Sequence, residues 1–226
     1  MDVDIRERYE RNFWMLVTDS ILLLDASEQN RDPDISNAIA RGSILNSLLL
    51  PEVAANCCID SLGLDQRLFK EIDRLTVLGK FEFYLHSRFR GRSIDHGSKP
   101  VQGFQELRKL RDRSVHPKKQ KVMWTHSADG TATAERQTTS LLGIAINQMD
   151  WWSEDGVIAM KATHDFLRYF FVDCCRYSKP KVSGLLCSED EELKDGDYFV
   201  PYLYKRTRDS LVRWGVSIDY FKIGWL

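Results

Sequence analysis

Apolar side chains recur at steps of three and four residues along most of this chain, a spacing that places them on one face of an α-helix. The first such series runs from Ile5 to about Ser27 and consists of Tyr9, Phe13, Leu16, Val17, Ile21 and Leu24. A helix with one apolar face must cover that face with other elements. The periodicity therefore predicts an all-α helical bundle.

Five further helices follow from the same spacing. They are expected at Ile35 or Ser36 to Leu62, Gln66 to His86, Gly103 to Val115, Glu154 to Tyr177, and within Tyr198 to Leu226. Ser36 is the predicted N-cap of the second helix, and Pro51 is expected to kink or divide it. Small side chains, which let neighbouring helices approach closely, are frequent in this helix: Ala38, Ala40, Gly42, Ala54 and Ala55. We therefore expect it to be the central helix.

One segment departs from helical periodicity. Side chains alternate from Val122 to Thr125 and again from Thr131 to Ala134, with Asp129-Gly130 between them. Asp-Gly is a strong signal for the tight turn of a β-hairpin. The sequence thus predicts a small β-hairpin insertion in the bundle. No internal repeat or linker divides residues 1–226, so we expect a single domain.

The composition narrows the classes of protein. The chain is 43% hydrophobic and 29% charged, which is typical of a folded domain. Its five cysteines form two adjacent pairs and one single residue, a poor framework for disulfides, so we expect a cytoplasmic protein. It has no CxxC pair and its histidines are scattered, so the sequence predicts no metal site and no cofactor. The longest apolar run, Phe13 to Val17, is too short to span a membrane.

Positive charge is concentrated in one window. Between Arg88 and Lys121 there are eleven basic and three acidic side chains, a local net charge of +8 in a chain whose total is −1. Such a local field attracts a polyanion such as RNA. The residues that we expect to bind RNA are Arg108, Arg113, Lys118, Lys119 and Lys121. The alternative is that the window forms an ordinary solvated face.

Arg111, Asp112 and His116 are the candidate catalytic residues, at the end of a predicted helix and just before Pro117. A guanidinium offers a planar fork of donors that matches phosphate oxygens. Histidine is the side chain best suited to proton transfer near neutral pH. RNA cleavage uses both groups, because it needs a cation at the phosphate and a donor and an acceptor of protons.

The spacing of Arg111 and His116 constrains the local fold. On a continuous helix they would lie roughly 140° apart around the axis. The helix must therefore end between them if both are to face one site, and Pro117 favours this because it disfavours helical geometry at residue 116. The sequence is compatible with an end before Ser114 or at Val115. The alternative interpretation is that Arg111 binds a nearby acid and His116 caps the helix.

The stretch from Leu107 to Lys118, LRKLRDRSVHPK, resembles the signature of the HEPN superfamily. In that signature an arginine, a polar residue, a short spacer and a histidine follow an amphipathic helix. The stretch from Ala40 to Asn56 is similar to the small-residue helix of the same family. The resemblance covers about residues 36–177 and leaves residues 178–226 as a C-terminal extension.

The resemblance implies both a fold and an activity. HEPN domains are helical bundles that commonly form homodimers, which brings two Arg–His motifs together across one cleft. Many are metal-independent endoribonucleases of toxin–antitoxin, abortive-infection and CRISPR systems, while others are non-catalytic RNA-binding or protein-interaction modules. Carried onto this chain, His116 is the acid or base, Arg111 is the phosphate clamp and Asp112 is the polar residue that orients them, although Asn is commoner there. RNA is then the substrate, and an antitoxin or another protein is a further partner.

Three other positions bear on this interpretation. Glu52 and Asn56 lie one turn apart on the predicted central helix, where they either face the cleft or form a polar contact at the edge of the bundle. His164 lies in an apolar helix and is expected to be a packed core residue.

Overall fold

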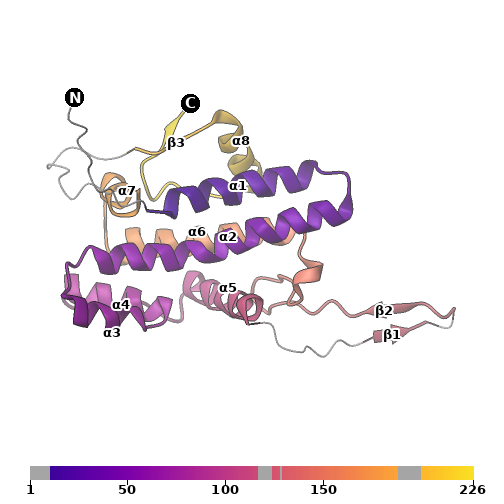
Figure 1. Ribbon diagram of the computed structural model, residues 1–226, viewed down its shortest axis with the longest axis horizontal. Helices are drawn as coiled ribbons and strands as arrows, with labels where there is room; N and C mark the ends of the chain where they lie inside the picture. The colour runs from indigo at the N-terminus through magenta and orange to yellow at the C-terminus, as the bar shows by residue number, and fades with distance from the viewer. Residues whose placement is uncertain (1–10, 117–123, 128, 188–199) are drawn as a thin grey trace, which may run out of the picture.

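The computed structural model describes residues 11–116, 124–127, 129–187 and 200–226. It is mostly helical, as the periodicity predicts, with 65% of the structure in helices. The described α-helices are α1 (Phe13–Gln29), α2 (Pro33–Asp60), α3 (Gln66–Asp73), α4 (Val77–Arg88), α5 (Lys99–Val115), α6 (Ser153–Arg168), α7 (Lys179–Cys187) and α8 (Lys205–Trp214). Figure 1 shows α1 and α2 side by side, with α4 and α5 along the opposite side of α2.

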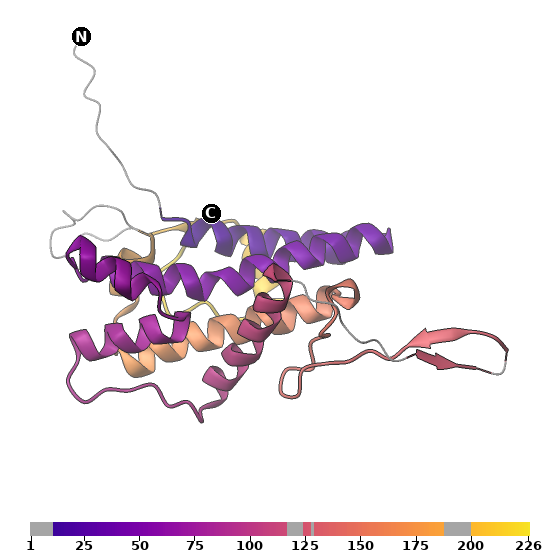
Figure 2. The ribbon, with the colours of Figure 1, turned by 60° about the horizontal axis from the view of Figure 1, so that its bottom comes forward.

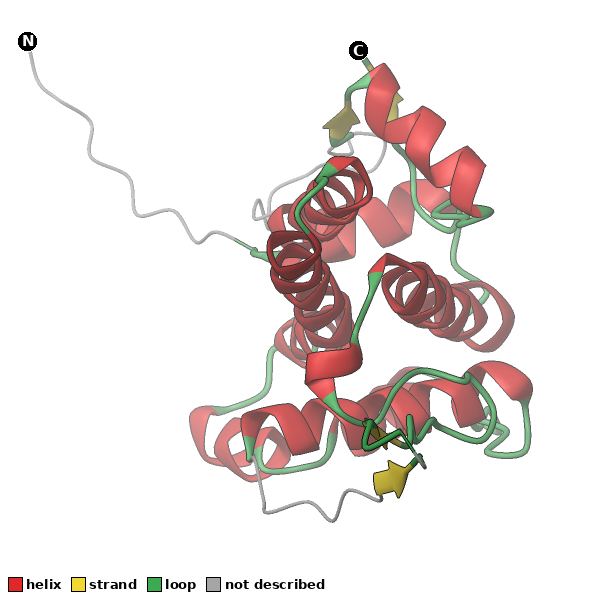
Figure 3. Cartoon of the chain, turned by 90° about the vertical axis from the view of Figure 1, so that its right-hand side faces the viewer, coloured by secondary structure: helices red, strands yellow, loops and turns green. Residues whose placement is uncertain are grey.

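The predicted β-hairpin is confirmed. Strand β1 (Trp124–His126) pairs with β2 (Ala132–Ala134) in an antiparallel sheet, with Trp124 opposite Ala134. Figure 2 shows the hairpin extending away from the helices. A second pair of strands, β3 (Tyr202–Leu203) and β4 (Gly224–Trp225), is parallel and was not predicted. In Figure 3 the hairpin and the C-terminus lie at opposite ends of the molecule.

Helix α2 is the central helix, as its small residues predict. It packs against α1, α4, α5 and α6. The helix is long and apolar enough to cross a membrane by length and composition, and 61% of its most apolar window is buried inside the structure. Its apolar side chains are therefore used in packing against the neighbouring helices.

The start of α2 differs from the prediction. Asp32, not Ser36, is the N-cap, and its side chain accepts hydrogen bonds from the backbone N–H groups of Asp34 and Ile35 at 3.0 and 3.1 Å. Pro33 occupies the first helical turn, where its missing N–H costs nothing. Ser36 lies inside the helix, where its hydroxyl donates to the carbonyl of Ser27 at 2.8 Å.

Pro51 does not divide α2, which runs unbroken from Pro33 to Asp60. A proline inside a helix leaves the carbonyl four residues earlier without its usual N–H donor. Here that carbonyl belongs to Ser47, and the hydroxyl of Thr163 on α6 donates to it at 3.2 Å. The contact between α2 and α6 therefore replaces the missing hydrogen bond.

Other helices also differ in extent from the prediction. The expected helix from Gln66 to His86 is two helices, because Thr76 caps α4 by accepting from the N–H of Gly79 at 3.1 Å. Helix α5 begins at Lys99, before the predicted Gly103. Helix α1 begins at Phe13; the residues of its predicted start at Ile5 lie outside the described part. The predicted helix from Glu154 continues beyond α6 as a π-helical segment, Tyr169–Cys174.

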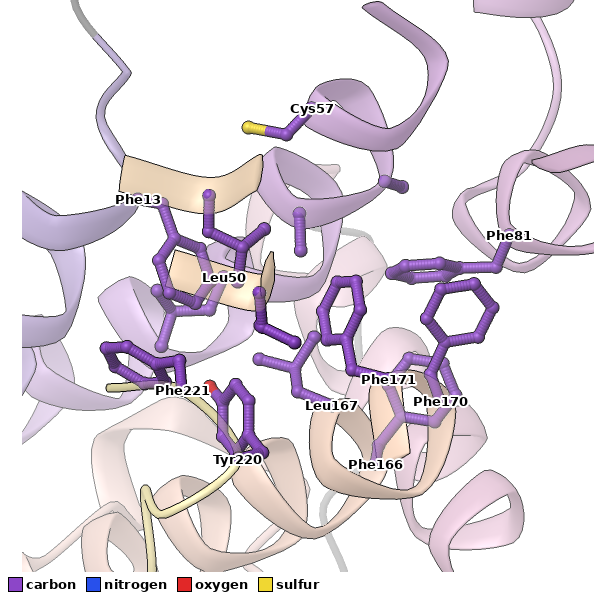
Figure 4. Packing of buried hydrophobic residues seen from close by; sticks show 14 of the residues in the cluster. Phe13, Leu50, Cys57, Phe81, Phe166, Leu167, Phe170, Phe171, Tyr220 and Phe221 are labelled. Carbon is purple, nitrogen blue, oxygen red and sulfur yellow. The ribbon is translucent and has the colours of Figure 1, made fainter. Parts of the chain in front are cut away.

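Aromatic side chains make up much of the core (Figure 4). Phe81 of α4 lies 5.3 Å from Phe166 and 4.3 Å from Phe170, measured between ring centroids. At the other side of the cluster, Phe221 lies 6.0 Å from Phe13 of α1. Residues of α7 and of the described segment 200–226 thus share one buried cluster with the helices that precede them.

A buried carboxylate joins α8 to α1. Asp25 has a side chain only 5% exposed and accepts hydrogen bonds from Ser210, at 2.8 Å, and from Arg206 and Arg213. Burial raises the pKa of Asp25, but the hydrogen bonds from Ser210, Arg206 and Arg213 outweigh it and hold the pKa below its ordinary value. Helix α8 is therefore fixed on the α1 side of the bundle, away from α5 (Figure 1).

Candidate functional site at the end of helix α5

Helix α5 ends at Val115, which is one of the two ends compatible with the sequence. The helix continues through Val115, and His116 is its C-cap residue, with φ −121° and ψ 67°. The backbone N–H of His116 donates to the carbonyl of Asp112 at 3.0 Å. The side chain of His116 is exposed. An imidazole in this position is open to solvent at the C-terminal end of the helix.

Arg111 is held by two carboxylates. Its Nη2 donates to Glu52 of α2, and its Nη1 donates to Asp112 Oδ1 at 3.1 Å. The side chain is 27% exposed. The alternative interpretation of the sequence was that Arg111 binds a nearby acid and that His116 caps the helix. Both of these features are present in the structure. The two contacts use only part of the five N–H donors of a guanidinium, so the group is oriented but not saturated.

A pocket of about 260 Å³ adjoins this ion pair. It lies where α2, the start of α4 and α5 meet. Its lining residues are Leu48, Glu52, Thr76, Val77, Phe104, Arg108, Arg111 and Asp112. On α5 the lining residues are spaced by three and four, which places them on one face of the helix. Arg111 and Asp112 therefore face the pocket, and His116 lies beyond its lining residues.

Arg108 lines the same pocket and is half-buried. Its Nε is buried and has no hydrogen-bond partner among the residues that the structure describes. A buried donor without an acceptor is costly, so a movement of Arg108 that let this atom donate to an acceptor in the pocket would be favourable. Among the other residues expected to bind RNA, Arg113 is exposed, and Lys118, Lys119 and Lys121 lie outside the described residues.

Two arginines of the basic window form hydrogen bonds that stabilise the fold. Arg88 donates to the carbonyl of Ser61 at 2.6 Å. Arg92 donates to the carbonyls of Cys174 and Cys175 at 3.0 and 2.7 Å. These two arginines satisfy backbone carbonyls at the ends of helical segments, so some of their N–H donors are used within the fold while their positive charge remains.

Glu52 and Asn56 have different roles. Glu52 reaches the site through Arg111, whereas Asn56 accepts a hydrogen bond from the buried Lys80 at 2.8 Å. Lys80 also forms an ion pair with Asp73 at 2.6 Å. The sequence missed the contributions of Thr76, Val77 and Phe104 to the pocket, because apolar and capping residues carry no chemical signal of their own.

Other reactive groups lie in the core. His164 is 1% exposed, which confirms its predicted place, and burial lowers its pKa to about 3. Burial also raises the pKa of Cys57 to about 11 and of Cys175 to about 12, so both thiols are poor nucleophiles. Across residues 11–116, 124–127, 129–187 and 200–226, no group of three or more His, Cys, Asp or Glu side chains has the arrangement of a metal site.

Comparison with protein-family models, with curated proteins and with solved structures finds no match to this chain. The site is therefore interpreted from its own chemistry and from the resemblance of its sequence motif.

Proposed function

We propose that this protein is a metal-independent endoribonuclease of HEPN type. The observation that carries the proposal is the place of His116: an exposed imidazole at the end of α5, five residues after an arginine that faces a pocket. A proton-transfer group and a phosphate-binding group are then offered by one short segment. Chemistry of this kind needs no metal ion.

In the proposed reaction the 2′-oxygen of a ribose attacks the adjacent phosphorus and the bond from phosphorus to the 5′-oxygen breaks. A base takes the proton of the 2′-hydroxyl, and an acid gives a proton to the departing 5′-oxygen, leaving a 2′,3′-cyclic phosphate and a 5′-hydroxyl. His116 serves as one of these groups. The remaining N–H donors of Arg111 bind the non-bridging oxygens, where negative charge grows in the transition state.

Asp112 is a positioning residue in this scheme. Its carboxylate accepts from Arg111 Nη1, and its backbone carbonyl accepts the N–H of His116. The same residue therefore orients the guanidinium and fixes the backbone from which the imidazole projects. One chain offers one such histidine, so the second proton-transfer group comes from a second copy in a homodimer.

Cleavage of a mixed RNA pool in EDTA tests the proposal. Wild-type protein is expected to cut, and His116→Ala is expected to lower the rate by about 10² to 10⁴-fold, the usual contribution of a general acid or base. His86→Ala, which removes another exposed histidine, is the matched control and should cut like the wild type. Cleavage that requires Mg²⁺, or that survives in His116→Ala, would contradict the proposed mechanism.

A second candidate function is a non-catalytic module that binds RNA or a protein. The pairing of Arg111 with Glu52 and Asp112 favours it, because two carboxylates compete with phosphate for the same guanidinium. This candidate predicts no cleavage by the folded protein, together with retention of RNA that weakens as salt is raised. Filter binding at two salt concentrations, run beside the cleavage assay, distinguishes the two functions.

A further inference from the structure

The pocket beside Arg111 combines apolar walls with polar groups of both signs. Leu48, Val77 and Phe104 supply apolar surface. The charged lining consists of Glu52, Asp112, Arg108 and Arg111, whose formal charges cancel. A free phosphate in this pocket would meet two carboxylates as well as two guanidiniums. A neutral, flat ligand with both donors and acceptors on its edge matches the lining better.

The size of the pocket agrees with such a ligand. Its volume of about 260 Å³ far exceeds the ~30 Å³ share of one water molecule. It lies below the range of about 300–1,000 Å³ that is usual for drug-sized ligands. A single nucleobase, stacked between apolar side chains and read at its edge, is the part of an RNA chain that fits these limits.

The polar groups select among the bases. Guanine presents adjacent donors, N1–H and the 2-amino group, beside adjacent acceptors, O6 and N7. A carboxylate accepts from both donors, and an arginine fork donates to both acceptors. Glu52 uses Oε2 for Arg111, and Arg108 Nε is a buried donor without a partner in the described part of the chain. The pocket lining therefore offers one arginine to donate and one carboxylate to accept, and Glu52 Oε2 must leave Arg111 for both carboxylate oxygens to accept from guanine.

We propose that this pocket binds a guanine base of the RNA, with Glu52 reading its donors and Arg108 its acceptors, so that the enzyme cleaves next to guanosine. This inference rests on the proposed function for its biological meaning. Binding of a base requires no cleavage, so an experiment can refute the guanine pocket without refuting the endoribonuclease, and the other way round.

Calorimetric titration of the wild-type protein with 3′-GMP, 3′-AMP, 3′-CMP, 3′-UMP and inorganic phosphate tests the pocket. We expect 3′-GMP to bind about 5- to 150-fold more tightly than the other nucleotides, the discrimination of a good bidentate contact. Inosine 3′-monophosphate, which lacks the 2-amino group, is expected to bind more weakly than 3′-GMP. Equal affinities for the four nucleotides, no binding of any, or inorganic phosphate binding as tightly as 3′-GMP would overturn the proposal.

The variant Glu52→Gln tests whether Glu52 is the residue that recognises guanine. It is expected to lose the preference for guanine, whereas Glu71→Gln, which alters an exposed i,i+3 ion pair with Arg74, should keep it. If Glu52→Gln does not fold, the comparison of inosine with guanosine nucleotides in the wild type decides. A guanine preference without RNA cleavage would refute the proposed nuclease and support the guanine pocket. RNA cleavage without a base preference would support the nuclease and refute the guanine pocket.

Discussion

Replacing His164 with glutamine is expected to flatten the dependence of the free energy of unfolding on pH between about 7 and 5. The imidazole is 1% exposed, and its Nδ1 lies 2.9 Å from the hydroxyl of Tyr220. Its Nε2 is buried with no hydrogen-bond partner among the described residues. Burial lowers the pKa of His164 from 6.5 to about 3. The folded protein therefore keeps this histidine neutral in mild acid.

The sign and size of the effect follow from the two pKa values. Because the folded pKa is below the unfolded value, the unfolded chain binds a proton below about pH 6.5 while the folded chain does not. Stability is complete above that pH and is lost progressively down to about pH 3. Each pH unit corresponds to about 1.4 kcal/mol, so about 2 kcal/mol is lost by about pH 5. In a protein of this size that loss lowers Tm by about 4–8 °C.

Thermal unfolding followed by circular dichroism at about pH 7, 6 and 5 measures this loss in the wild type and in His164→Gln. His86→Gln, at an exposed histidine, is the matched control and should keep the wild-type slope. An equal fall of Tm with pH in the wild type and in His164→Gln would refute the reasoning. If His164→Gln does not fold, NMR titration of the wild-type imidazole replaces it, and a His164 signal that titrates near pH 6.5 would be the contradicting result.

Three further predictions concern other charged and reactive groups. Asp25→Asn is expected to lower the free energy of unfolding in urea by about 1.5–3 kcal/mol, because charge-assisted hydrogen bonds join α1 to α8; an unchanged value at neutral pH would contradict this. Because the folded pKa of Asp25 is lowered, the wild type loses this contribution as the pH falls below about 4. Asp112→Asn is expected to strengthen RNA binding, measured by fluorescence anisotropy, because Arg111 then meets one carboxylate fewer; weaker binding would count against a phosphate-binding role for Arg111. Cys57 and Cys175 are expected to resist iodoacetamide at about pH 8 until urea unfolds the chain, because burial raises their pKa to about 11 and about 12; rapid labelling of the native protein would contradict this.

The sequence predicted most of the helices and the hairpin because each has a local cause, whereas α7 was not predicted. Apolar residues at helical spacing give α1, α2 and α6, and Asp129-Gly130 gives the hairpin turn. The break between α3 and α4 was missed because the apolar series Leu68, Ile72, Leu75 and Leu78 continues across it. Only the capping hydroxyl of Thr76 marks the new helix, and a single threonine in an apolar series is a weak signal.

The candidate site was only partly visible in the sequence. Arg111, Asp112 and His116 stand within six residues, so a local motif identifies them. The pocket beside them is formed by tertiary packing of α2 and the start of α4 against α5. Glu52 lies 59 positions before Arg111, and nothing in the spacing of the two residues predicts that they form an ion pair. Long-range pairing of this kind depends on how the helices cross, which periodicity does not specify.

The ion pair at Arg111 links the two proposals. A guanidinium held by Glu52 and Asp112 is fixed in direction but electrically neutralised, so alone it binds a phosphate weakly. A guanine that engages Glu52 through its N1–H and 2-amino donors draws that carboxylate away from Arg111. The released N–H donors of Arg111 then become available to the adjacent phosphate. If both proposals hold, base recognition and phosphate binding are coupled through one carboxylate, and Glu52 makes the site favour RNA over free phosphate.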